Sequence, residues 1–190
     1  MEVTTKILDN TVISSFIKEI TSIKIIPRCP YKIVTSREVC KECEKFDKKF
    51  VKQFGSNLLI LNPTDNNLYS TLFSYLESRY PYLHGGEIST FLLAFLGFYL
   101  KGKCYYFITD DKKMHKVVSN LNSDNLFLKI ANIKKFDDFR ISWTIGLLKR
   151  MYAKDKINKM EIELIIEDLK KSTFFITEEI LNSLRNKNGP

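Results

Sequence analysis

The chain has 190 residues, of which 44% are hydrophobic and 27% charged, an ordinary globular composition with enough length for one sizeable core. Its 30 Lys and Arg against 22 Asp and Glu give a formal charge of +8, which favours a polyanionic partner without identifying one. The longest apolar run, residues 88–100, is shorter than the roughly 20 residues that span a bilayer, so no membrane association is expected. The first residues lack the basic and apolar regions of a signal peptide, and we therefore expect a cytoplasmic protein.

Strand-like and helical segments alternate along the first two thirds of the chain. Buried strands are expected at residues 6–8, 31–35, 58–61, 105–109 and 126–130. Helices are expected at residues 12–20, 36–54, 65–80, 88–100 and 112–121. This alternation predicts an α/β fold with a central parallel sheet.

From residue 136 the pattern becomes helical, with expected segments at 141–152, at 159–170 and from Thr177 onward. We therefore predict a single domain over residues 1–190. It would consist of an alternating core over about 1–133 and a C-terminal helical extension over about 136–184.

The four cysteines do not form a recognisable metal site. Cys40 and Cys43 make a CxxC pair, but Cys29 and Cys104 are isolated, and a zinc site would need a second close pair. We expect helical thiols without a cofactor, and a Cys40–Cys43 disulfide stays open as an alternative.

Carboxylates follow two of the expected strands. Asp9 follows residues 6–8, and Asp110 and Asp111 follow the strand at 105–109. The carboxyl ends of parallel strands share one edge of the sheet, where open α/β proteins place their sites. Two carboxylates about 4 Å apart repel by roughly 4 kcal/mol at an effective dielectric near 20, so a cluster there requires a cation.

Helices supply further acids. Glu87 lies in the first turn of the helix that contains residues 88–100, where a Glu alone is often only a partner for the helix dipole. Glu38 and Glu42 are one turn apart on one face of a lysine-rich helix, where either one alone would normally be a solvated residue. Ligation by oxygen, without Cys or His, suits Mg²⁺ or Mn²⁺.

Other catalytic patterns are missing from the sequence. It contains no GxGxxG, no P-loop and no HExxH motif. His84 and His115 are its only histidines, and neither belongs to a recognisable Ser/His/Asp set.

Short motifs along nearly the whole chain resemble those of PIN domains. Ile7–Ile13 resembles the first motif, Thr35–Glu42 the second, and Thr109–Lys113 the last. The subfamily indicated has a Gly-Glu helix start as its third motif, here Gly86-Glu87-Ile88.

The tail of that subfamily is also similar to this chain. It carries a Thr-x-Gly-Leu-Leu helix, here Thr144–Leu148, and a Phe-x-Ile-Thr-x-Glu-Ile-Leu ending, here Phe174–Leu181. The chain departs from the subfamily at Met114-His115, where Ala-Arg is usual, and at Trp143, where Gly is expected.

The resemblance implies a PIN-like three-layer α/β/α fold and a metal-dependent endoribonuclease, often the toxin of a toxin-antitoxin pair. Carried over position by position, the catalytic and metal-binding residues would be Asp9, Glu42, Glu87 and Asp110, with Asp111 beside them. Thr11 or Thr109 would orient a carboxylate through a hydrogen bond. The implied cofactor is Mg²⁺ or Mn²⁺, and the implied partners are single-stranded RNA, an antitoxin protein and a second copy of the chain.

Glu38 stays open as the second ligand in place of Glu42. Two alternative functions also stay open beside this hypothesis. One is a PIN-like module that binds RNA or protein without cutting, although a pure binder gains nothing from acids that repel phosphates. The other is a structure-specific DNA nuclease, which the lack of a long basic arch segment disfavours.

Overall fold

The computed structural model describes residues 5–45, 47–54, 57–63, 66–102, 105–136, 139–172 and 176–187. Within these residues the strands are β1 (Thr5–Leu8), β2 (Lys32–Ser36), β3 (Leu58–Leu61), β4 (Tyr105–Ile108) and β5 (Arg140–Ser142). They form one sheet in the order β3-β2-β1-β4-β5, in which every neighbouring pair is parallel. The α/β fold and the parallel sheet predicted from the alternating pattern are thus confirmed.

The helical segments that connect and follow these strands are α1 (Asn10–Ser14), the π-helical turn η1 (Ser15–Glu19), the 3₁₀ turn η2 (Ile26–Arg28), α2 (Arg37–Glu44), α3 (Phe50–Phe54), α4 (Asn67–Arg79), α5 (Gly85–Lys101), α6 (Lys112–Leu121), α7 (Asn125–Ala131), α8 (Thr144–Ala153), α9 (Lys159–Lys171) and α10 (Glu178–Arg185). Polar side chains fix several of their starts, because Ser36, Asn66 and Thr177 each accept a hydrogen bond from a backbone N–H of the first turn. The helix expected over 36–54 is two helices, α2 and α3. Its expected stop at Gly55, and the expected start of the next helix at Asp65, lie outside the described residues.

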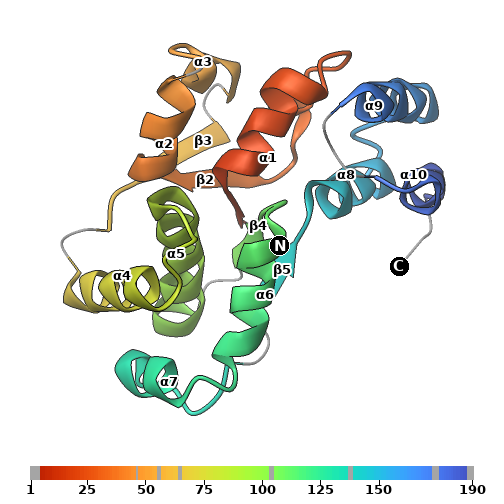
Figure 1. Cartoon of the computed structure of the whole chain (residues 1–190). Helices are drawn as coiled ribbons and strands as arrows, with labels where there is room; N and C mark the ends of the chain where they lie inside the picture. Colours follow the sequence, from red (N-terminus) through yellow and green to blue (C-terminus); the bar gives the residue numbers. More distant parts are fainter. Residues whose placement is uncertain are drawn as a thin grey trace.

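Helices cover both faces of the sheet (Figure 1). Successive strand residues point to opposite faces. Leu8 and Ile108 therefore pack with α1, α2, α8, α9 and α10, whereas Ile7 and Phe107 pack with α4, α5, α6 and α7. The result is three layers with a hydrophobic core on each side of the sheet.

The strand predicted at residues 126–130 is wrong, because this segment is the helix α7. The side chain of Asp124 accepts a hydrogen bond from the N–H of Phe127 at 3.0 Å and so caps the helix start. Phe127 and Ala131, one helical turn apart, are its buried residues. A short apolar run fits a strand or a helix equally well, and here the capping residue and the packing select the helix.

The boundary predicted near residue 133 is also wrong. The fifth strand, β5, lies in the segment predicted to be purely helical and pairs Ile141 with Phe107 of β4. The helices after it share the hydrophobic core of α1 and α2, so they are part of the layer over one face of the sheet. None of the helices in the described ranges is both long and apolar enough to cross a membrane.

Candidate active site

The order of the strands brings together the chain segments that carry Asp9 and Asp110. From β1 the chain adds β2 and β3 on one side and then returns to add β4 on the other, so the connections diverge between β1 and β4. Ligands of open parallel sheets bind at the carboxyl ends of strands at such a point. Asp9 directly follows β1, and its N–H donates to the carbonyl oxygen of Ile108, the last residue of β4, at 3.1 Å.

Two threonines hold one oxygen of Asp9. The hydroxyl of Thr109 donates to Asp9 Oδ2 at 3.0 Å, and that of Thr11 donates to the same oxygen at 3.2 Å. These hydroxyls also accept hydrogen bonds from the backbone: the N–H of Asp110 donates to Thr11, and that of Asp111 donates to Thr109. Thr11 and Thr109 thus connect the ends of β1 and β4 into one hydrogen-bonded network.

The other oxygen of Asp9 has no partner. Oδ1 is buried and makes no hydrogen bond within the described part of the chain, and the residue has 0% exposure. Burial raises the pKa of Asp9 to about 6, and the charge of Glu42 adds to this, against the lowering effects of the backbone N–H of Asn10 and of the two threonine hydroxyls. A buried carboxylate oxygen without a donor costs on the order of 1 to 3 kcal/mol, so this atom is suited to a proton or a cation.

Glu42 reaches this edge from α2. Its carboxylate lies against the first turn of α5, where a Cβ added at Gly86 would be 2.7 Å from both of its oxygens. Glu38, one turn earlier, points to a different partner: its Oε2 accepts from the hydroxyl of Ser89 at 2.8 Å, and that hydroxyl accepts from Tyr69. The charge of Glu42 acts on Asp9, whereas the Glu38 carboxylate is bound to Ser89, so Glu42 is the better candidate ligand of the two.

Glu87 has a structural role and a place in the cluster. Its Oε2 accepts a hydrogen bond from the N–H of His84 at 2.9 Å and so caps α5. Burial, together with the nearby charges of Asp9 and Asp111, raises the pKa of Glu87 to about 8. The hydrogen bond from His84 lowers this pKa, but burial outweighs it and the neighbouring acids add to the rise.

Asp110 and Asp111 have different surroundings. The N–H of Thr144, at the start of α8, donates to Asp110 Oδ1 at 2.8 Å, and the hydroxyl of Thr144 donates to Oδ2. Burial nevertheless raises the pKa of Asp110. Asp111 Oδ1 accepts from the N–H groups of Lys113 and Met114 and so caps α6.

The predicted acids therefore converge on one edge of the sheet from β1, α2, α5 and β4. Within the described ranges, however, no group of three or more His, Cys, Asp or Glu side chains is close enough to hold an ion as it stands. Carboxylates repel at short distance, so such a set can close only if a cation or bound protons offset the repulsion. The unpartnered Asp9 Oδ1, with the charges of Glu42 and Glu87 nearby, offers oxygen donors of the kind that a divalent cation takes.

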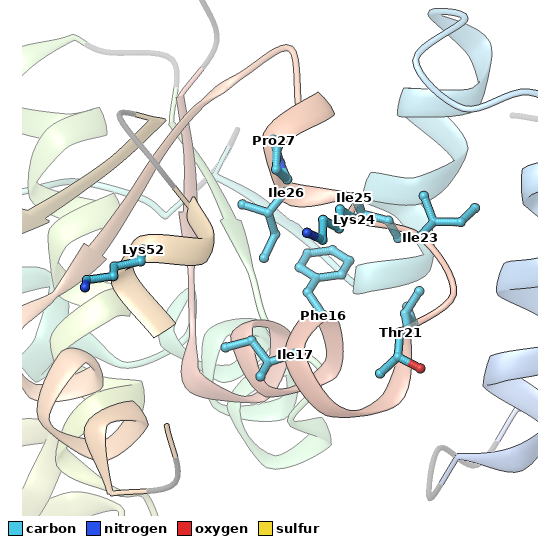
Figure 2. A pocket seen from close by; sticks show the side chains of 10 residues that line it. Phe16, Ile17, Thr21, Ile23, Lys24, Ile25, Ile26, Pro27 and Lys52 are labelled. Atoms are coloured by element: carbon cyan, nitrogen blue, oxygen red, sulfur yellow. The ribbon is translucent and has the colours of Figure 1, made fainter. Parts of the chain in front are cut away.

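Other features of the molecule lie away from these acids. A hollow of about 390 Å³ is lined by apolar residues around η1 and η2, including Phe16 and Ile26, with Lys24 and Lys52 (Figure 2). None of the candidate metal-binding acids lines this hollow.

The side chains of Cys29, Cys40 and Cys43 are buried free thiols. Burial raises the pKa of Cys43 to about 12. Cys104 lies outside the described residues.

Sequence reasoning missed two features beside the acids. It gave no role to Thr144, whose contact with Asp110 depends on the unrecognised strand β5. It noted His115 and Trp143 only as departures from the resemblance, whereas their rings stack at 3.6 Å between centroids and 6° between planes.

In comparisons with known proteins, no protein-family model, curated protein or solved structure matches this chain.

Proposed function

We propose that this protein is a metal-dependent endoribonuclease of the PIN type, which hydrolyses phosphodiester bonds of single-stranded RNA. The observation that carries the proposal is the buried Asp9 carboxylate at the switch point of the sheet, with one oxygen fixed by two threonines and the other without a partner. A binding module has no use for such an acid, because it neither packs as an apolar side chain nor attracts phosphate.

Asp9, Glu42, Glu87 and Asp110 would hold Mg²⁺ or Mn²⁺, with Asp111 beside them. When bound, the ion would lower the pKa of a water molecule and stabilise charge on the phosphoryl and leaving oxygens. Thr11 and Thr109 would keep Asp9 in one orientation, and Thr144 would do the same for Asp110. In the metal-free protein, burial and the neighbouring acids raise the pKa of Glu87 and so favour its protonated form.

The role of toxin in a toxin-antitoxin pair, with an antitoxin protein as partner, belongs to the same proposal and is supported by the resemblance of the motifs alone.

The contact of Glu42 with Gly86 supports the Gly-Glu motif as a functional unit, since the absence of a side chain at Gly86 leaves room for the Glu42 carboxylate.

The test is cleavage of labelled single-stranded RNA, and of DNA of the same sequence, with Mn²⁺ or with a chelator. We expect wild type to cut RNA only with the metal and Asp9→Asn to be inactive. Glu42→Gln should lose activity while Glu38→Gln, its matched control one turn away, keeps most of it. Cleavage by Asp9→Asn at the wild-type rate, or metal-independent cleavage, would overturn the proposal, and preferential cleavage of DNA would favour the DNA nuclease alternative.

A further inference from the structure

An exposed aromatic ring lies beside the candidate site. Trp143, between β5 and α8, is 38% exposed although it is the largest side chain type. The imidazole of His115 covers one face of the indole at 3.6 Å, so the exposed area belongs to the opposite face and the edges of the ring.

The Trp143 ring is connected to the acids through its stacking partner, His115, and through its chain neighbour, Thr144. His115 Nε2 is 2.9 Å from the carbonyl oxygen of Thr109, which fixes the imidazole to the end of β4. The next residue in the chain, Thr144, binds both oxygens of Asp110. Trp143 is therefore linked to the acidic cluster by a backbone neighbour and by a side-chain neighbour, and the stacked imidazole restricts the orientation of its ring.

A second exposed aromatic side chain lies near the start of α6. Tyr82, in the connection before α5, is 46% exposed. Its ring lies 6.0 Å from the ammonium group of Lys113 in the first turn of α6. Tyr82 precedes the start of α5, which carries Glu87, and its contact with Lys113 places it beside the start of α6, the helix that also carries His115.

We propose that Trp143 and Tyr82 are platforms on which bases of a single-stranded nucleic acid stack, on either side of the phosphate that faces the acids. This inference rests on the proposed function and deepens it by assigning the residues that select a single strand. An aromatic ring stacks on any base, so the platforms bind without sequence preference. A duplex keeps its bases paired and stacked inside, and it cannot use such rings without opening.

The chain contains one tryptophan, so fluorescence excited at wavelengths that tyrosine does not absorb reports on Trp143 alone. Wild type is titrated in Ca²⁺ with a short oligouridylate, with its DNA equivalent, with an abasic oligomer of the same length and with duplex RNA. We expect the single strands to quench the emission. The abasic oligomer, which has the same phosphates but no bases, should bind more weakly and leave the emission unchanged, and the duplex should act weakly.

Binding is then measured for variants by anisotropy of a labelled oligouridylate. Trp143→Ala should weaken binding by about 5- to 150-fold, which corresponds to the roughly 1 to 3 kcal/mol of one base stacked on an aromatic ring. Trp143→Phe should retain much of the affinity. The matched control is Leu126→Ala, which removes an apolar side chain 54% exposed on α7 and should bind as wild type does.

Wild-type affinity in Trp143→Ala, equal quenching by the abasic oligomer, or no binding of any oligonucleotide would each overturn the inference, and the last result would favour a protein partner for this surface. Failure of the nuclease proposal gives a different pattern. Quenching by single strands without cleavage in Mn²⁺ refutes the enzyme and keeps the platforms, whereas cleavage without quenching keeps the enzyme and refutes the platforms.

Discussion

Asp9 is a single residue whose ionisation works against folding. Its pKa is raised from 3.8 to about 6, chiefly by burial. Below about pH 4 the carboxyl is protonated in both the folded and unfolded states, so it does not affect stability. Between about pH 4 and 6 the unfolded chain releases the proton and the folded chain retains it, which favours the unfolded state as pH rises.

We predict that, in chelator, Asp9→Asn is more stable than wild type at pH 7 by on the order of 1 to 3 kcal/mol, the range that a shift of this size implies. The difference should vanish near pH 4. Denaturant unfolding of both proteins from pH 4 to 8 measures it. A variant that is less stable than wild type at every pH would mean that the carboxylate is a structural cap.

Gly86 and Gly85 offer a matched pair of substitutions at the start of α5. A Cβ at Gly86 would meet the Glu42 carboxylate at 2.7 Å, whereas one at Gly85 would meet Phe73 at 3.6 Å, an ordinary contact. The glutamate side chain is flexible and can move away, and Ala is favoured over Gly in a helix by up to about 1 kcal/mol.

We therefore expect both Gly86→Ala and Gly85→Ala to melt at or above the wild-type temperature, with only Gly86→Ala losing metal-dependent cleavage, by about tenfold or more. Thermal melting and an RNA cleavage assay test this. Equal activity in the two variants would place Glu42 outside the working site. The sequence indicated that Gly86 precedes a candidate ligand, but the contact with Glu42 depends on how α2 packs against α5 and could not be predicted.

Among the elements, the start of α8 positions Asp110 through Thr144. Thr144→Ser keeps the hydroxyl, and Thr144→Ala removes it while the backbone N–H remains. We predict that the alanine variant loses about 10- to 100-fold in metal affinity and that the serine variant is close to wild type, because groups that orient a ligand have effects of this size. The rise of melting temperature with Mn²⁺ concentration measures it. Equal curves for the two variants would show that the hydroxyl has no part in the site.

The strands near this site show which parts of the fold could be predicted from the sequence and which could not. Strands with longer apolar runs, such as Tyr105–Ile108, were predicted in the right place, and Asp110 and Asp111 follow that strand as expected. β5 has only three residues with one strongly apolar side chain, Ile141, and carries no alternating pattern. Its position is set by pairing with β4, a tertiary interaction that no local pattern encodes. Thr144 could not be placed beside Asp110 without that strand.

At the scale of the molecule, one of the two cores joins the ends of the chain. The side chain of Asp168 in α9 accepts hydrogen bonds from the N–H groups of Thr21 and Ser22, which follow η1, at 2.9 and 2.7 Å. Glu161 in the same helix pairs with Arg28 of η2. In Figure 1 the helices α8, α9 and α10 accordingly lie together beside the sheet on the α1 side. Helical periodicity predicted these helices, but not their place in the core that positions Asp9.

This packing leads to a prediction for truncated chains. The residues of α9 with at most 1% exposure are Ile162, Ile165, Ile166 and Leu169. Their burial contributes together on the order of 10 kcal/mol, comparable with the roughly 5 to 15 kcal/mol that stabilises a whole domain. A chain of residues 1–156 should therefore show no cooperative thermal transition by circular dichroism, whereas residues 1–186 should melt within a few degrees of the full chain. If residues 1–156 melted cooperatively near the full-length temperature, α9 and α10 would be a separable extension, and the site would have to be stable without them.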